Sequence, residues 1–170
     1  MVRSVRCSRS VFLTCALVVW CTAAAPLRAA GQVYSTWDTL EPDKCASIWL
    51  IKRHIDARAI FRFYPHGVTI DEGIAFDTPD AKFRRYHNKS TFETLLEHHR
   101  LTDPKLRYVG RLIHDIEVNI WERKALAETH EREAALQALL AAADAERSVD
   151  LCIDYFDRLS NGASVDAAAP

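Results

Sequence analysis

The chain has 170 residues, of which 49% are hydrophobic, so it is long enough to form one domain with a buried core. Its 22 Lys and Arg residues nearly balance its 23 Asp and Glu residues, which gives a formal net charge of −1. Because residues 1–30 contain four arginines and no acid, the remainder carries 18 basic and 23 acidic side chains, a net charge of −5. This acidic balance argues against nucleic acid as a partner.

Residues 1–30 have the features of a secretory signal peptide. Arg3, Arg6 and Arg9 precede an apolar run over residues 11–25. The run is shorter than the roughly 20 apolar residues that a membrane span needs. We therefore expect a Sec-type signal that is removed, and a mature protein that is periplasmic or secreted. An uncleaved membrane anchor is the alternative.

Cys45 and Cys152 are the two cysteines outside this segment. An oxidising compartment permits a disulfide between them. If one lies in the first helix and the other in the last, antiparallel packing brings them together. The bridge would then stabilise the fold by about 4 kcal/mol in the chain-entropy model. Two buried thiols that pack as small hydrophobic side chains are the alternative.

The predicted elements begin after a lead-in over residues 31–42. Residues 43–56 predict a helix, because isoleucines recur there at helical spacing. Residues 59–64 then alternate with the period of two that is typical of a strand. Residues 74–77 predict a second short strand, and residues 82–87 a third.

Two helix starts are marked by capping residues. Ser90 and Glu93 have the spacing of a capping box. Asp103 followed by Pro104 is typical of the first turn of the next helix. That helix carries the clearest apolar stripe in the chain, which consists of Leu106, Val109, Ile113, Ile116 and Ile120.

The last part of the chain is helical in composition over residues 125–159, with a break near residues 144–148. Residues 164–170 predict a loose tail. The fold class is therefore α+β, a predominantly helical single domain over residues 31–163 with two or three short strands.

Several short motifs follow one another in a fixed order along the chain. The first comprises Asp43, Lys44, Ala46, Trp49, Leu50, Ile51, Arg53, Ile55, Asp56, Phe61, Phe63 and Pro65, and residues 75–79, 90–93 and 114–117 carry the others. In this order they resemble the chromate resistance protein family, the module at the C-terminal end of the regulator ChrB. The resemblance covers residues 37–159 and implies a role in chromate resistance. Family members often have Cys and Pro just before the Trp, where this chain has Ser47 and Ile48, so a thiol mechanism on that cysteine cannot operate here.

Chromate is a tetrahedral dianion, so a site for it needs Arg or Lys side chains and directed N–H donors. Five basic side chains are candidates for an oxyanion site: Lys44, Arg53, Arg84, Arg85 and His87. The helix start at Ser90 offers further donors directly after this basic run. The alternative is that the run is a solvated strand edge protected by charge.

Arg53 and His114 are polar motif residues beside buried helical stripes, where a charge is costly without a partner. We therefore expect them to lie close together, with a basic side chain from residues 82–89 completing a small pocket. The alternative is a structural ion pair of Arg53 with Asp56 or Asp77.

A second constellation could hold a metal. His114 and Glu117 are three residues apart on one helix face, so with Asp115 and Glu93 they predict ligands for a divalent metal ion. Glu93 has an alternative role in the capping box. The chain contains no H-E-x-x-H, C-x-x-C or G-x-G-x-x-G motif.

These observations predict an exported chromate resistance protein that binds chromate or a related metal species. One alternative is a metal-dependent hydrolase or oxidoreductase that uses His114, Asp115, Glu117 and Glu93. Another is a subunit that assists a membrane chromate transporter.

Overall fold

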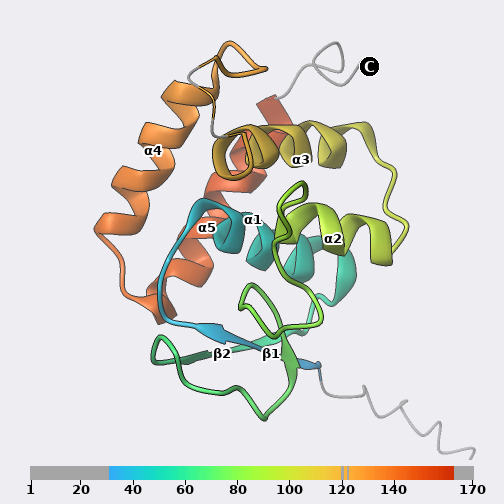
Figure 1. Ribbon diagram of the computed structural model, residues 1–170, viewed down its shortest axis with the longest axis vertical. Helices are drawn as coiled ribbons and strands as arrows, with labels where there is room; N and C mark the ends of the chain where they lie inside the picture. Colours follow the sequence, from blue (N-terminus) through green and yellow to red (C-terminus); the bar gives the residue numbers. More distant parts are fainter. Residues whose placement is uncertain (1–30, 120, 122, 163–170) are drawn as a thin grey trace, which may run out of the picture.

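The computed structural model describes residues 31–119, 121 and 123–162, so the predicted signal peptide, the predicted tail and Ile120 lie outside the described residues. The described part is a small sheet packed against helices, which confirms the predicted α+β class (Figure 1). Its elements in chain order are β1 (Val33–Trp37), α1 (Pro42–Leu50), the π-helical turn η1 (Ile51–Ile55), β2 (Ile60–Tyr64), β3 (Ile74–Ala75), α2 (Thr91–His98), α3 (Pro104–Glu117), α4 (Thr129–Ala141) and α5 (Ala145–Gly162).

The sheet is parallel and has the strand order β2-β1-β3. Its central strand β1 lies in the segment that the sequence predicted to be a lead-in, so that prediction was wrong. Ser35 and Thr36 are fully buried there, and burial on both faces is typical of a central parallel strand. The third strand predicted over residues 82–87 does not form, because Phe83 and Tyr86 make only isolated bridges.

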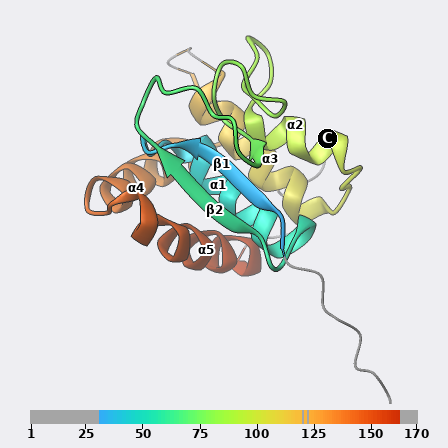
Figure 2. The same cartoon turned by 90° about the horizontal axis from the view of Figure 1, so that it is seen from below.

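Helices cover one face of the sheet, and β1 and β2 lie in front of α1 when the molecule is seen from below (Figure 2). Phe61 and Phe63 of β2 pack against the core, as their alternation predicted. The loop after β2 is held to the strands at two points. The indole N–H of Trp37 donates to the Val68 carbonyl at 2.8 Å, and Arg62 pairs with Glu72 at 2.7 Å.

Helix α1 is the centre of the core, since all its residues from Asp43 to Leu50 are buried. The ring of Trp49 stacks on Phe92 of α2 with centroids 6.4 Å apart and lies 5.7 Å from Phe156 of α5. Ile48 and Ile51, which the isoleucine spacing predicted to be buried, are fully buried, and Ile55 is partly buried against the core.

Both predicted helix starts are confirmed. Ser90 and Glu93 form the two reciprocal bonds of a capping box on α2. Asp103 accepts the backbone N–H of Lys105 at 2.7 Å at the start of α3. The break between the last two helices falls at residues 142–144, slightly before its predicted place. Among the described residues, no helix has the length and apolar character required to cross a membrane.

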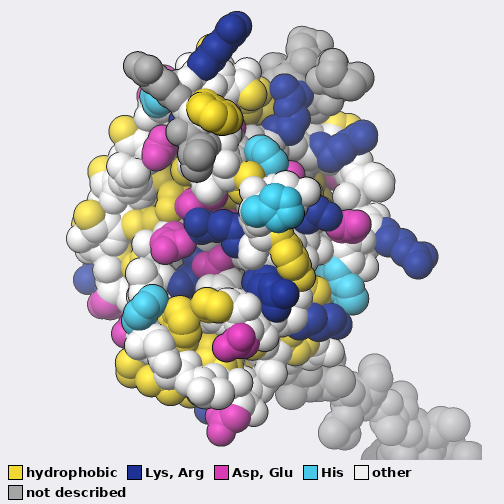
Figure 3. Space-filling model, in the orientation of Figure 1, with side chains coloured by type: hydrophobic (Ala, Val, Ile, Leu, Met, Phe, Trp, Pro, Cys, Tyr) yellow, Lys and Arg dark blue, Asp and Glu magenta, His cyan; other side chains and the backbone are white. Residues whose placement is uncertain are grey.

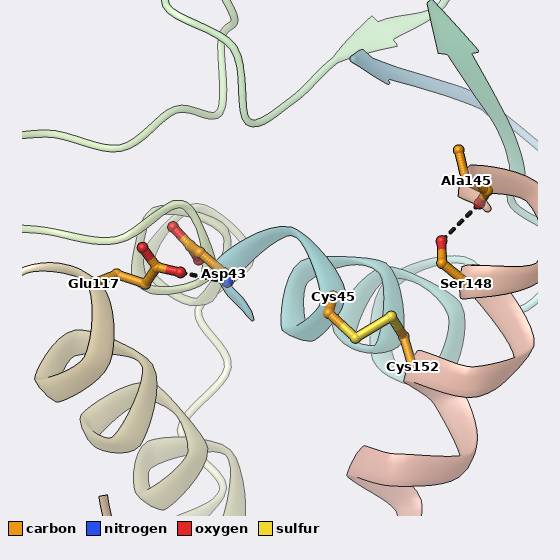
Figure 4. The surroundings of a disulfide bond; sticks show 6 residues. All are labelled: Asp43, Cys45, Glu117, Ala145, Ser148 and Cys152. Carbon is orange, nitrogen blue, oxygen red and sulfur yellow. Dashed lines mark hydrogen bonds between the residues drawn. A yellow bond between two sulfur atoms is a disulfide. The ribbon is translucent and has the colours of Figure 1, made fainter. Parts of the chain in front are cut away.

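A disulfide joins Cys45 of α1 to Cys152 of α5, with Cα atoms 5.2 Å apart (Figure 4). Of the two alternatives left open by the sequence, the bridge is therefore confirmed. Both half-cystines are buried, at 2% and 0% exposure, so the bond is shielded from solvent reductants. It ties the last helix of the chain to the central one.

Candidate functional site

Two cations and four carboxyls gather where α1, α2 and α3 meet. This buried ion cluster consists of Glu41, Asp43, Lys44, Asp77, Arg85 and Glu117. Its members come from the start of α1, the segment after β3, the loop before α2 and the end of α3. In the middle of the face shown in Figure 3, Lys and Arg side chains likewise lie beside Asp and Glu side chains.

Asp43 is fully buried and serves the start of α2. Its Oδ2 accepts the backbone N–H of Thr91 at 2.7 Å, and its Oδ1 accepts that of Phe92 at 2.9 Å. Ser90 Oγ accepts the next one, from Glu93, at 3.1 Å. The free N–H groups that begin a helix attract an anion, and here the protein's own oxygens occupy them. The prediction that this helix start donates to a bound oxyanion was therefore wrong.

Glu117 accepts a backbone N–H group at the start of α1, as Asp43 does at the start of α2. Its Oε1 accepts the backbone N–H of Asp43 at 3.2 Å, and Figure 4 shows the two residues facing each other. Its Oε2 lies 2.9 Å from Nη2 of Arg85, which also pairs with Glu41 at 2.8 Å. Burial opposes the charge on Arg85, but these carboxyls raise the pKa of its guanidinium. Arg85 thus links the starts of both helices.

Lys44 is only 2% exposed, and its ammonium is directed inward. Its Nζ donates to the carbonyl of Trp37 at 2.9 Å and to that of Thr39, and lies 3.7 Å from Asp77 Oδ2. Burial lowers the pKa of Lys44. The side chain therefore holds the end of β1 against the start of α1.

Three carboxyls of the cluster, those of Asp43, Asp77 and Glu117, are less acidic than free ones. Burial, and then the neighbouring charge of Asp77, raise the pKa of Asp43 to about 8. Burial also raises the pKa of Asp77 and that of Glu117. The cluster consequently carries less negative charge near neutral pH than the number of its acids suggests.

Beside the cluster lies a cavity of about 450 Å³, which we call the Arg84 cavity. It is lined by Trp37, Thr39, Glu41, Lys44, His66, Asp77, Thr78, Pro79, Arg84 and Arg85. Three of the five predicted oxyanion residues therefore meet here. Arg84 lies 4.9 Å from the centre of the Tyr86 ring and, unlike Lys44 and Arg85, has no ion-pair partner among the described residues.

Arg53 is not part of this cavity. Its Nη2 lies 2.6 Å from Oδ2 of Asp157, whose Oδ1 also accepts the indole N–H of Trp49 at 2.8 Å. The ion-pair alternative for Arg53 is therefore confirmed, but the partner lies on α5, 104 residues away, and is neither Asp56 nor Asp77. Because the pair is half-exposed, we expect it to contribute little to stability.

His114 lines a different cavity, of about 610 Å³, together with His87 and Glu93. Its Nδ1 lies 2.9 Å from Oε2 of Glu93, and the same oxygen accepts the backbone N–H of Ser90 at 2.8 Å. Arg53 does not line this cavity, so the predicted pocket between Arg53 and His114 does not form. His87 is likewise separated from the other predicted oxyanion residues.

Asp115 is a structural carboxylate. Both its oxygens accept the backbone N–H of Ala125 at 2.9 Å, and it also accepts from Leu126, Asn119 and the hydroxyl of Thr129, the last at 2.5 Å. Burial opposes its charge, but these hydrogen bonds lower the pKa of Asp115 to about 2. The carboxylate thus fixes the connection from α3 to α4.

Two of the four predicted metal ligands, Glu93 and His114, contact each other and line the same cavity as Asp115. Asp115, however, binds the connection after α3, and Glu117 binds Arg85. Within the described ranges, no group of three or more His, Cys, Asp or Glu side chains is placed to hold a metal ion. The structure therefore does not support the predicted four-ligand site.

Sequence reasoning missed the two acids that pair with predicted oxyanion residues, Glu41 with Arg85 and Asp157 with Arg53. Glu41 directly precedes Pro42, and this position before a helix-starting proline was a signal that could have identified it. Asp157 lies on the polar side of a predicted helix, where no local pattern distinguishes it from its acidic neighbours.

Comparison with known proteins identifies the family. Residues 34–162 match the family described as "ChrB, C-terminal domain". The chain belongs to this family. The ChrB-like resemblance that the motifs predicted is therefore confirmed, and with it a place in the chromate resistance family. The chain is also 32% identical over 95 residues to Protein ChrB of Cupriavidus metallidurans, an alignment that covers 55% of this chain and 29% of that protein. No solved structure matches the chain.

The hydrogen bonds of Asp115 generate a prediction on pH and stability. The pKa of Asp115 is about 2 in the folded state and 3.8 in the unfolded one, so the carboxylate stabilises the fold above about pH 4. This contribution, about 2 kcal/mol, is lost as the pH falls toward 2. Asp115→Asn should reduce the free energy of unfolding at pH 7 by about 2 kcal/mol or more. The amide N–H₂ group of the new asparagine cannot accept hydrogen bonds from the donors that now bind the carboxylate.

Urea titrations at pH 7 and at points between pH 4 and 2 measure this effect in the wild type, in Asp115→Asn and in Asp150→Asn, an exposed control on α5. The stability difference between wild type and Asp115→Asn should shrink as the pH falls, while Asp150→Asn should follow the wild type. A difference that is constant over this range contradicts the assignment.

Proposed function

We propose that this domain of the chromate resistance family binds chromate or a related tetrahedral oxyanion in the Arg84 cavity. The observation that carries the proposal is the convergence of Lys44, Arg84 and Arg85 on one cavity, from two places in the sequence about 40 residues apart. The family supports the choice of chromate among the oxyanions.

The charges that line the cavity favour an anion. Three cations face two carboxyls there, those of Glu41 and Asp77. The side chain of Glu41 is 45% exposed, so an entering anion can displace it into water. Burial raises the pKa of Asp77, which reduces its repulsion of an anion.

Arg84 is the main ligand in this proposal, because its guanidinium pairs with no carboxylate of residues 31–119, 121 or 123–162. A planar guanidinium offers paired N–H donors that match two oxygens of a tetrahedral anion. Arg85 is held in place by Glu117, so it adds charge at little cost in ordering. The hydroxyl of Thr78, which lines the same cavity, supplies a further donor.

The test is chromate-dependent thermal stability. At a chromate concentration a hundred times the Kd, binding should stabilise the wild type by about 2.7 kcal/mol. Arg84→Gln should lose most of this stabilisation but unfold at the wild-type temperature without ligand, since no ion pair is broken. Arg107→Gln, at an exposed position of α3, is the matched control and should respond as the wild type does.

The same series separates Arg84 from Arg53. Because Arg53 pairs with Asp157 outside the cavity, Arg53→Gln should retain the full response to chromate. Equal stabilisation of wild type and Arg84→Gln by chromate would remove the Arg84 cavity as the site. Sulfate, a tetrahedral dianion too, measures how far the site distinguishes chromate.

We also propose that the chain is exported. The signal-like segment over residues 1–30 motivates this, and the disulfide supports it, because such bonds persist in oxidising compartments and are rare in the cytosol. Mass spectrometry of unreduced protein from the periplasm should find a mature start between Ala24 and Gly31 and no free thiol. A cytoplasmic chain that retains Met1 and has two free thiols at Cys45 and Cys152 contradicts export.

A further inference from the structure

A second cavity, of about 330 Å³, lies among α3, α4 and α5 and is separate from the sites described above. We call it the two-arginine cavity. It is lined by Tyr108, Arg132, Tyr155, Arg158, Leu159 and Gly162. None of these residues belongs to the buried ion cluster, and none of the lining side chains is acidic.

The two arginines of this cavity are not neutralised. Neither Arg132 nor Arg158 has a carboxylate within ion-pair distance among the described residues. The Nε atom of Arg132 is buried and has no hydrogen-bond partner there. A buried donor without a partner costs free energy, so a shift of the Arg132 side chain toward a ligand acceptor in the cavity would be favourable.

The tyrosines supply apolar walls and hydroxyl groups. The Tyr108 hydroxyl donates to Glu128 Oε1 at 2.8 Å, and that of Tyr155 donates over a long 3.4 Å to the Arg132 carbonyl. Burial, and then the bond to Glu128, raise the pKa of Tyr108 to about 12, and burial raises that of Tyr155. Both hydroxyls thus stay protonated at neutral pH. The carboxylate of Glu128 is engaged by the Tyr108 hydroxyl.

We propose that the two-arginine cavity binds a small organic anion, with its phosphate or carboxylate group between Arg132 and Arg158 and its apolar part against the tyrosine rings. Ligand cavities commonly measure about 300–1,000 Å³, so this cavity of about 330 Å³ is large enough for a small molecule. It is also larger than a bare tetrahedral ion fills, and Leu159 with the two rings provides an apolar wall.

Calorimetry with phenyl phosphate, benzoate and inorganic phosphate as probes tests this proposal on the whole mature chain. Phenyl phosphate or benzoate should bind, and inorganic phosphate should bind at least tenfold more weakly because it lacks an apolar part. Comparison of phenyl phosphate with benzoate shows which anionic group the arginines prefer. Absence of binding by both organic probes at millimolar concentration overturns the proposal. Equal binding of inorganic phosphate overturns it as well.

Variants locate the site. Arg158 is exposed and forms no ion pair within the part of the chain that the structure describes, so Arg158→Gln should fold normally and bind the organic probe at least tenfold more weakly. Arg158→Lys, which keeps the charge but loses the paired donors, should be intermediate. Arg147→Gln, at an exposed position of the same helix, is the matched control and should bind as the wild type does. Unchanged affinity in Arg158→Gln overturns the assignment.

The two binding proposals can fail independently. Arg158→Gln should retain the chromate response of the wild type, since Arg158 does not line the Arg84 cavity. Conversely, Arg84→Gln should retain affinity for the organic probe. Loss of both responses in either variant contradicts the separation of the sites.

Discussion

The structure depends on a carboxylate buried between two helix starts. Asp43 opens the central helix and at the same time accepts the first two backbone N–H groups of α2. Removing a carboxylate from water is costly unless hydrogen bonds and opposite charge compensate. Here two N–H groups, a helix dipole and the nearby guanidinium of Arg85 compensate in part, and burial still raises the pKa of Asp43 to about 8. The position of α2 relative to α1 follows from this arrangement.

The need to compensate the buried carboxyls also determines which cations are available for a ligand. Arg85 is committed to Glu41 and Glu117, and Lys44 to two carbonyls and Asp77. Arg84 is next to Arg85 in the sequence, yet its guanidinium lies over the Tyr86 ring and has no ion-pair partner in the described part of the chain. A count of basic residues would rank these three side chains equally. In the proposed site, their contacts favour Arg84 as the main ligand and leave the other two in a supporting role.

A second link fixes the opposite side of α1. The disulfide from Cys45 to Cys152 and the contact of Trp49 with Asp157 both join α1 to α5. Helix α5 in turn contributes Tyr155 and Arg158 to the lining of the two-arginine cavity. Tyr155 supplies a hydroxyl group there, and Arg158 supplies a positive charge. The central helix is therefore held by ionic contacts toward the Arg84 cavity and by covalent and apolar contacts toward α5.

Local patterns predicted most helices, because the residues that define a cap or an apolar stripe lie close together in the sequence. The Ser90 capping box, the start of α3 and the buried face of α1 were all found in this way. Strand β1 was missed because its five residues become a strand only by pairing with β2 and β3, which lie far along the chain.

The candidate site was predicted only in part, again because its contacts join residues that lie far apart in the sequence. The basic residues were visible in the sequence, but their partners lie far away, as Asp157 does for Arg53. Asp115 looked like a metal ligand because residue type and spacing do not show where hydrogen bonds go. Its real partners lie 4 to 14 residues downstream, in a connection without a periodic pattern.

The position of bound chromium tests the account most directly. An anomalous difference map from a crystal soaked in chromate would locate the metal without assumptions about affinity or stability. The account predicts a single strong peak in the Arg84 cavity, within hydrogen-bonding reach of the Arg84 guanidinium through the chromate oxygens. A peak only beside His114 or between Arg132 and Arg158, or no peak at a concentration that saturates the thermal response, would contradict it.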